Sequence, residues 1–363
     1  IRDLVRSRGL GDVYKRQKGG IYLALDKTVP MMTHFLEGQL RERKISNADI
    51  AFVLNDTTLK EGDMPQYVYD AKIVEGDQVC LNGYYHVLDR VVVTPQNMAE
   101  VIRTNGETNL FSCMLDRFSA PYYDKTLEQE FNVANGLQLD SMVFQKRYIS
   151  QRSQDGAITL DPDGMTLGNF PFLGYDPGWN TYNTSSSVAK EMDMAAMFVP
   201  SDDAMKEYFL RGGGAMLIKR YCPGQPNDEA HLKENLYQIP LPVIRSMIAN
   251  LMKDSFNETV PSKYRLITND AQDGMFADAS VDAYKKRFKK VMMANNGVIY
   301  VMNGVVAPAE YSSVMAPVQN DGGAEVMNTT IHADDNFTET DNGSAPLRKY
   351  YKTWLLYTSD AAD

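Results

Sequence analysis

The sequence predicts a chain that combines antiparallel strands with helices, and three observations carry this prediction. Residues 18–96 hold short runs of valine, isoleucine and aromatic residues separated by Gly-Asp and Asn-Gly pairs, a pattern typical of antiparallel strands. From Asn97 onward, apolar residues recur at three-and-four spacing, which indicates helices. Around residue 200, an apolar run stops at a proline and a helix-forming stretch follows.

The first region is expected to be mainly strand. The apolar runs predict strands at 51–54, 67–69, 72–74 and 84–93. The pairs Gly62-Asp63, Gly76-Asp77 and Asn82-Gly83 are expected to form the turns between them.

Helices are expected to open the next region. One apolar face is formed by Met98, Val101 and Ile102, and a second by Leu110, Cys113, Met114 and Phe118. Residues 150–188 are rich in glycine, proline, asparagine, aspartate and serine, which predicts an insertion with loop structure.

A strand followed by a helix is predicted around residue 200. Met197-Phe198-Val199 is the strand, and Ser201 is a suitable N-cap for a helix that continues to Leu210. Asp202 and Asp203 lie in the first turn, where the helix dipole favours anions. A further helix is expected over 241–256, with Ile244, Met247, Ile248 and Leu251 on one face.

A tight turn of the primed type is expected at Asn295-Asn296-Gly297, because asparagine and glycine readily adopt positive φ. The strand that follows is apolar at nearly every position, so it should be buried on both faces. A similar segment begins at Asn82, 214 residues before Asn296, which indicates an internal repeat.

These segments resemble the two signature boxes of the fasciclin domain, an extracellular adhesion module. The first box is matched by Phe198, Pro200, Ser201, Asp202 and Ala204. The second is matched by Asn296, Gly297, Val298, Ile299, Val301 and Asn303, and is repeated by Asn82, Gly83, His86 and Asp89. The resemblance implies an α+β fold, a fasciclin-like β-sandwich wedge with packed helices, used in tandem.

The resemblance also suggests a domain organisation. Residues 18–96 are expected to be the C-terminal half of a truncated fasciclin-like domain, and residues 97–316 a domain that carries both boxes. Residues 317–355 are expected to be a linker and the possible start of a third domain. The ends, 1–17 and 356–363, resemble translated sequencing adapters and are expected to be non-native.

Composition excludes some partners. The chain has 37 basic and 47 acidic residues and no basic block, so nucleic acid is not an expected partner. It has no apolar run long enough to span a bilayer. Its cysteines, Cys80, Cys113 and Cys222, lack metal-type spacing and are expected to be buried small hydrophobes.

No motif in the sequence predicts catalysis or a cofactor. The histidines His34, His86, His231 and His332 lie in no nucleophile elbow or paired-ligand motif, and His86 is expected to make a core hydrogen bond. The Asp161-Pro162-Asp163-Gly164 segment begins like a calcium loop but lacks the later acidic ligands, so an ordinary turn is expected. We therefore expect no catalytic residues, metal or organic cofactor.

The function that the resemblance implies is non-catalytic adhesion by a bacterial protein at the cell surface. The expected location is extracellular or on the outer-membrane surface, with the protein a lipoprotein candidate, and the expected partner is a protein or glycan ligand. An alternative is glycan capture by the aromatic insertion, with Phe172, Tyr175 and Trp179 as ligand contacts, because aromatic faces stack on sugars. A hydrolase cleft in the insertion is a further alternative.

Overall fold

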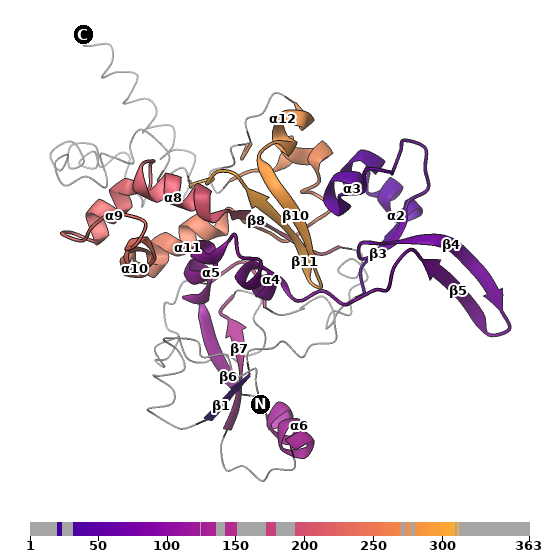
Figure 1. The fold of residues 1–363 in the computed structure, drawn as a ribbon, viewed down its shortest axis with the longest axis horizontal. Helices are drawn as coiled ribbons and strands as arrows, with labels where there is room; N and C mark the ends of the chain where they lie inside the picture. The colour runs from indigo at the N-terminus through magenta and orange to yellow at the C-terminus, as the bar shows by residue number, and fades with distance from the viewer. Residues whose placement is uncertain are drawn as a thin grey trace, which may run out of the picture.

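The described part of the chain has an α+β fold, seen in a computed structural model (Figure 1). The structure describes residues 20–23, 32–123, 125–135, 142–150, 172–178, 193–269, 272, 274–276, 280–308 and 311. Their strands form three sheets, ordered β1-β7-β6, β10-β11-β8-β9 and β2-β3-β4-β5. The expected non-native ends, the linker at 317–355 and the Asp161–Gly164 turn lie outside these residues.

The central sheet contains both predicted box strands. Its members are β8 (Ala195–Pro200), β9 (Met252–Lys253), β10 (Phe288–Ala294) and β11 (Gly297–Met302). β11 lies between β10, to which it is antiparallel, and β8, to which it is parallel. Every residue of β8 and β11 is buried, which confirms the expected burial of the second-box strand on both faces.

The two boxes are adjacent in space. Phe198 is in register with Tyr300, and their rings stack with centroids 5.1 Å apart. Phe288 of β10 completes the aromatic cluster, 5.9 Å from Phe198. Burial of large apolar side chains such as these three rings makes the main stabilising contribution to a core.

Helices gather at one end of the central sheet (Figure 1). They are α4 (Met98–Thr104), α5 (Asn109–Asp116), α8 (Asp202–Leu210), α9 (Ala215–Tyr221), α10 (Leu232–Gln238) and α11 (Leu241–Ala249). The prediction of a helix after Ser201 is confirmed, because the Ser201 hydroxyl accepts a hydrogen bond from the Ala204 amide. The α12 helix (Val281–Lys285) and the 3-10 helix η2 (Pro261–Leu266) lie elsewhere around the sheet.

The helix predicted over 241–256 is too long. It ends at Ala249, because Met252–Lys253 forms β9 and pairs with β8 instead. Leu251 is buried as expected, but it lies after the end of the helix.

A second sheet lies apart from the central one (Figure 1). It consists of β1 (Gly20–Leu23), β6 (Ser119–Tyr123) and β7 (Met142–Tyr148), with α6 (Lys125–Asn135) beside it. Asp176, in the described part of the predicted insertion, is fully buried and accepts a hydrogen bond from Arg147 Nε at 2.9 Å. The 172–178 segment is therefore held against β7 by a buried ion pair.

The N-terminal region forms the remaining sheet and two helices. Its elements are β2 (His34–Leu36), α2 (Glu37–Glu42), α3 (Asn47–Leu54), β3 (Gln66–Val68), β4 (Ala71–Cys80) and β5 (Gly83–Leu88). Its strand pairs are antiparallel, as predicted.

Three local predictions in this region are wrong. Residues 51–54 are helical, because Ser46 and Asp49 form a capping box that starts α3. Gly76-Asp77 lies inside β4, where the pairing register shifts and Asp77 has φ 54°, so the pair forms a bulge and not a turn. The predicted strand at 84–93 ends at Leu88.

The core crosses the expected domain boundary at residue 96. Phe35 packs on Phe256 with ring centroids 5.8 Å apart, and Phe52 packs on Phe288 at 6.2 Å. Both oxygens of the buried Asp49 carboxylate accept hydrogen bonds from Ser262, each at 2.7 Å. The N-terminal helices therefore share a core with the central sheet.

Candidate protein-binding surface

The first-box residues connect helices to the central sheet. The Ser201 amide donates to the Met302 carbonyl at 3.0 Å, which joins the end of β8 to the end of β11. One carboxylate oxygen of Asp202 accepts from the Leu110 amide at 2.8 Å and the other from Asn109 Nδ2 at 2.9 Å. Asp202 thus caps the start of α5, whose own N-cap, Thr108, makes no side-chain capping bond.

The second-box turn is buried and held by tertiary hydrogen bonds. Asn296 Oδ1 accepts from the Met98 amide at 2.9 Å, and its Nδ2 donates to the Pro177 carbonyl at 3.0 Å. Neither Asn295, Asn296 nor Gly297 has positive φ, so the predicted primed turn is wrong. The turn is tight, as expected, but its asparagine holds α4 and the 172–178 segment.

Gly297 is required for close packing of the strands. A Cβ atom at this position would lie 2.4 Å from the Ala195 carbonyl oxygen in β8. Real Cβ atoms essentially never approach a neighbour this closely. The glycine therefore allows β8 to lie against the start of β11.

The internal repeat predicted from the sequence has a structural counterpart. β5 begins at Gly83 and ends at Leu88, and β11 begins at Gly297 and ends at Met302. The first and last residues of β11 therefore each lie 214 residues after those of β5. Each strand follows a two-residue loop, closed by Cys80 and Gly83 in one hairpin and by Ala294 and Gly297 in the other. The two hairpins therefore share the length of their second strand and the position of the turn, whereas their first strands, β4 and β10, have 10 and 7 residues.

The residue after each strand also bonds to the start of its hairpin, although the two backbone acceptors differ by one position. The Asp89 amide donates to the Lys72 carbonyl at 2.9 Å. At the matching place, the Asn303 amide donates to the Arg287 carbonyl at 2.8 Å, and its Nδ2 donates to the Lys286 carbonyl at 2.9 Å. These contacts bring the end of the second strand back to the start of its hairpin.

The surroundings of the two hairpins are opposite. All residues of β11 are buried, whereas Gly83 to Val87 of β5 are exposed and only Leu88 is half-buried. His86 is exposed and its Nδ1 accepts from the Asp77 amide at 3.1 Å, so the expected core hydrogen bond of His86 is wrong. The hairpin of β4 and β5 projects from the body of the molecule (Figure 1).

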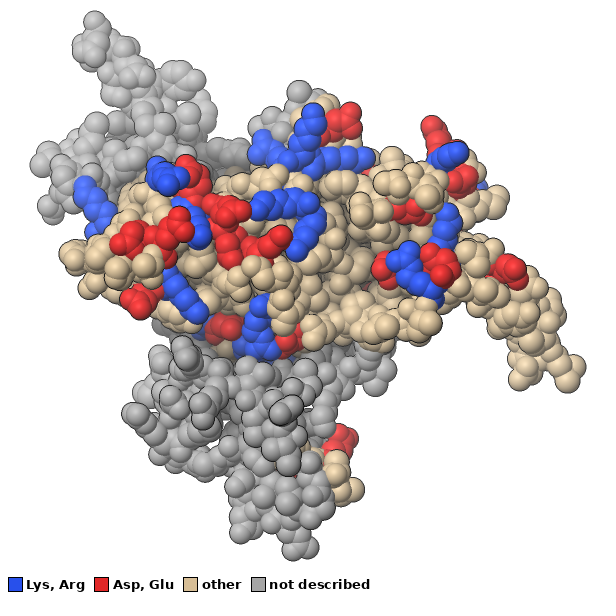
Figure 2. Space-filling view, in the orientation of Figure 1, with Lys and Arg blue, Asp and Glu red and all other residues tan. Residues whose placement is uncertain are grey.

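Exposed apolar side chains concentrate on this hairpin. We name the set the hairpin surface; its members are Val74, Val79, Leu81, Tyr84, Tyr85 and Val87, continued along the chain by Val91 and Val93. Val79 is 76% exposed and Tyr84 is 69% exposed, and the two are cross-strand neighbours. Figure 2 shows the projecting part with few charged side chains. Exposed apolar patches of this kind mark interaction sites.

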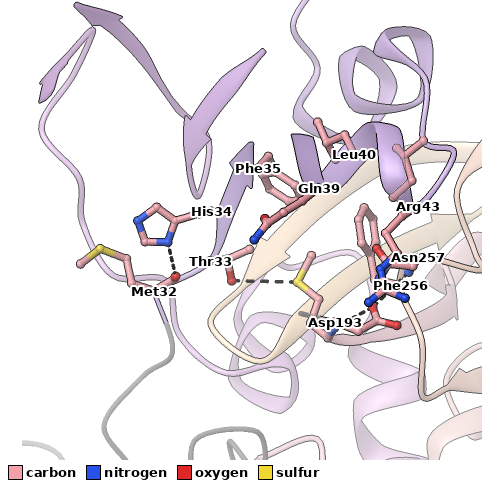
Figure 3. Close-up of a pocket in the computed structure, with 12 residues that line it drawn as sticks. Met32, Thr33, His34, Phe35, Gln39, Leu40, Arg43, Asp193, Phe256 and Asn257 are labelled. Carbon is pink, nitrogen blue, oxygen red and sulfur yellow. Dashed lines mark hydrogen bonds between the residues drawn. The ribbon is translucent and has the colours of Figure 1, made fainter. Parts of the chain in front are cut away.

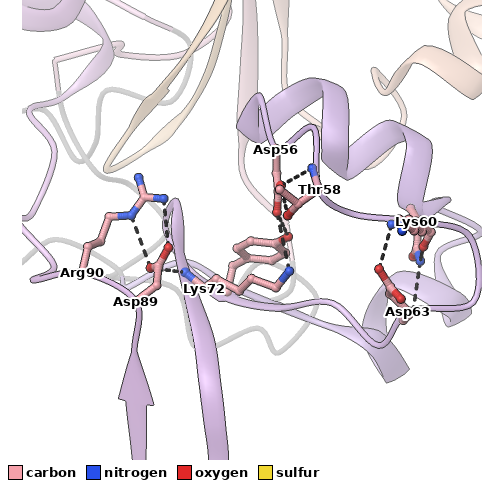
Figure 4. Close-up of polar contacts among 9 residues, drawn as sticks. Asp56, Thr58, Lys60, Asp63, Lys72, Asp89 and Arg90 are labelled. Atoms are coloured by element: carbon pink, nitrogen blue, oxygen red, sulfur yellow. Dashed lines mark hydrogen bonds and ion pairs between the residues drawn. The ribbon is translucent and has the colours of Figure 1, made fainter.

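Polar contacts hold the base of the hairpin (Figure 4). Asp89 accepts from the Lys72 amide at 2.8 Å and pairs with Arg90 at 3.1 Å. Asp56 accepts from the Tyr67 hydroxyl at 2.6 Å and lies 3.8 Å from Lys72 Nζ. Hydrogen bonds from the Thr58 side chain first, and then from Tyr67, lower the pKa of Asp56 to about 2. The hairpin surface therefore extends from a base that is held in place by polar contacts.

A small cavity lies between the N-terminal region and the central sheet (Figure 3). Its volume is about 140 Å³, and its walls include His34, Arg43 and Asp193. Burial raises the pKa of Asp193, whose carboxylate accepts from Ser255 Oγ at 2.6 Å and from the amides of Met194 and Asn257. Ligand pockets are usually larger, roughly 300–1,000 Å³, so the cavity is better explained as a packing gap.

The aromatic residues proposed for glycan contact lie in different surroundings. Tyr175 is 5% exposed and its hydroxyl donates to the Ala196 carbonyl at 2.9 Å, so its ring belongs to the core. Phe172 is half-buried, and its carbonyl accepts from Arg245 Nε at 3.0 Å. Trp179 lies outside the described residues, so nothing places it with these two rings.

The remaining chemical groups are dispersed. Cys80 is exposed, Cys113 half-buried and Cys222 buried, so the expected burial is wrong for Cys80. His231 pairs with Asp228 on the surface at 2.7 Å, and His332 lies outside the described residues. Among the residues that the structure describes, no three His, Cys, Asp or Glu side chains are grouped as metal ligands would be.

Comparison with protein-family models, curated proteins and solved structures finds no match. No helix in the described ranges has the length and apolar character needed to cross a membrane.

Proposed function

We propose that this chain is a non-catalytic binding module of a cell-surface adhesion protein, built from tandem fasciclin-like units. The sequence resemblance to the fasciclin boxes supports the family and the surface location. The adjacency of β8 and β11 supports a common structural role for the two boxes. The observation that carries the binding role is the hairpin surface, because exposed aromatic and aliphatic side chains on a projecting element favour contact with a protein.

The hairpin surface favours a protein ligand over a glycan. Val74, Val79, Leu81 and Val87 offer no hydrogen-bonding group to a sugar, and Tyr175 of the aromatic insertion is buried. Protein interfaces, in contrast, are enriched in tyrosine and have apolar centres.

The proposal can be tested by selecting binders from a phage-displayed library of short peptides with the full chain as target. We expect selected peptides to lose binding to the double variant Tyr84→Ser and Val87→Ser. Tyr237→Ser is the matched control, because Tyr237 is exposed on α10, far along the chain from the hairpin. Beads that carry the full chain should also be retained under flow on a surface coated with a selected peptide.

Two outcomes would contradict the proposal. One is that no peptide is selected while a glycan array shows binding, which would favour glycan capture by the insertion. The other is that selected peptides bind the Tyr84→Ser, Val87→Ser variant as well as the unmodified chain.

A further inference from the structure

We propose that the outer edge of β5 binds a parallel strand of the β8 type: a short apolar segment that ends at a proline followed by serine or threonine. The proposal rests on the binding role of the hairpin surface and specifies the partner as an extended segment that has the sequence pattern of β8 and is not already part of a folded sheet. In the internal repeat, β5 corresponds to β11, and the chain itself shows which strand lies beside β11.

The two repeated strands differ in the number of neighbours. β11 is bonded to β10 on one side and to β8 on the other. Among the residues that the structure describes, β5 is bonded only to β4 and is the last strand of its sheet. An edge strand presents unpaired N–H and C=O groups along its free side, and an added strand satisfies them.

The edge of β5 lacks the usual protection against pairing. Natural edge strands are often interrupted by lysine, proline or inward-pointing charges. The β5 sequence is Gly-Tyr-Tyr-His-Val-Leu, without proline, lysine or an acidic residue. The bulges of this hairpin lie in β4, so they leave the outer edge of β5 uninterrupted.

The side chains of β5 also suit a strand that is covered on both faces. Tyr84 and His86 point to one face, and Tyr85 and Val87 to the other, because side chains alternate along a strand. All four are exposed. In β11 the matching residues Val298, Ile299, Tyr300 and Val301 are all buried.

Gly83 is the most specific sign of an absent neighbour. Gly297, its equivalent, is required because β8 passes within 2.4 Å of where its Cβ would be. A Cβ on Gly83 would meet no atom of the described part of the chain within 4 Å, and the φ of Gly83 is not positive. Neither local conformation nor packing in this structure requires a glycine at position 83, whereas a strand seated as β8 is seated on β11 would require one.

The register of β8 on β11 specifies the partner sequence. Ala195 faces Gly297, Phe198 faces Tyr300 and Pro200 faces Met302. Transferred to β5, a small residue would lie beside Gly83, an aromatic residue beside His86 and a proline beside Leu88. This chain's β8 is itself fully buried, so a second copy cannot supply that strand without unfolding.

The direction of the added strand distinguishes this partner from a second copy of the chain paired through its own β5. Two copies that joined through their β5 edges about a twofold axis would pair antiparallel. A β8-type strand would pair parallel, with its N-terminus near Gly83.

The test uses the full chain and a synthetic peptide that copies residues 193–204, with a nitroxide spin label at its N-terminus. We expect saturable NMR shifts of the β5 amides and strongest paramagnetic broadening near Gly83. Gly83→Ala should lower the peptide affinity by about ten-fold or more, because the added methyl group occupies the place of the partner backbone, while the melting temperature stays unchanged. Gly304→Ala is the matched control, since a Cβ there also meets nothing within 4 Å.

Four results would overturn the proposal. Three concern the peptide: no binding, broadening at Leu88 instead of Gly83, and unchanged affinity in the Gly83→Ala variant. Dimers that form through β5 without peptide would also overturn it, in favour of a second copy. If phage-selected peptides still bind the hairpin surface in these cases, the proposed function stands and only the strand partner is wrong.

Discussion

The substitution Gly297→Ala tests how closely the two box strands must pack. The new Cβ would lie 2.4 Å from the Ala195 carbonyl oxygen and 2.8 Å from Met98 Cε. The Met98 side chain can rotate, but the carbonyl belongs to a fully buried central strand, so β8 or β11 must shift. Forcing an added methyl group into a packed core costs about 1–3 kcal/mol and occasionally more, and a clash with backbone places this variant near about 3 kcal/mol.

The assay is urea unfolding of the full chain, followed by tryptophan fluorescence and far-ultraviolet circular dichroism. The midpoint should fall for Gly297→Ala, and its melting temperature should drop by roughly 6–12 °C. Gly83→Ala is the control, because a Cβ there meets no described residue within 4 Å, and it should leave unfolding unchanged. Equal stability of Gly297→Ala and the unmodified chain would refute the close approach of β8 to β11.

Three further predictions concern single sites. Asp202→Ala should lower the free energy of unfolding by about 2 kcal/mol, because two charge-assisted hydrogen bonds to the start of α5 are lost; urea unfolding measures this, and a change below about 0.5 kcal/mol would contradict the capping role. The pKa of Asp56 is lowered to about 2, so its carboxylate stabilises the fold above about pH 4 and loses this effect as pH falls toward 2. The stability difference between the unmodified chain and Asp56→Asn should therefore shrink over that range, and a difference independent of pH would count against it. Calcium or EDTA should leave the melting temperature unchanged; a rise of several degrees with calcium would refute the expected absence of a metal site, with Asp161 and Asp163 as the first residues to substitute.

Local signals in the sequence were sufficient for the elements around the first box. Ser201 caps α8 with its own side chain, and the strand before it is apolar at each position. The alternation of strands and turns also predicted the antiparallel N-terminal sheet. These features depend on residues close in sequence, so a single chain is enough to find them.

Features set by distant residues could not be predicted in this way. The turn at Asn296 takes its conformation from bonds to Met98 and Pro177, far away in the sequence. The helix over 241–256 is shortened because β9 pairs with β8. The helix α3 is a different case: its capping signal, Ser46 and Asp49, is local, but the strand prediction depended only on the β-forming residues that follow, Phe52 and Val53.

The hairpin surface was also beyond prediction from sequence alone. β5 and β11 belong to segments with similar sequences, and the apolar pattern predicts burial of β11 but does not show that β5 is exposed. Burial was decided by whether a neighbouring strand is present, and only the structure shows that β8 covers β11 while β5 is the edge of its sheet.

Residue-resolved amide hydrogen exchange on the free full chain tests the central claim most directly, because it compares the two repeated strands in one sample. We expect β11 amides to exchange only through global unfolding, whereas amides at the free edge of β5 should exchange at least about 100-fold faster through local opening. Equal protection of residues 83–88 and 297–302 would show that the edge of β5 is already covered, and would contradict both the exposed hairpin surface and its proposed strand partner.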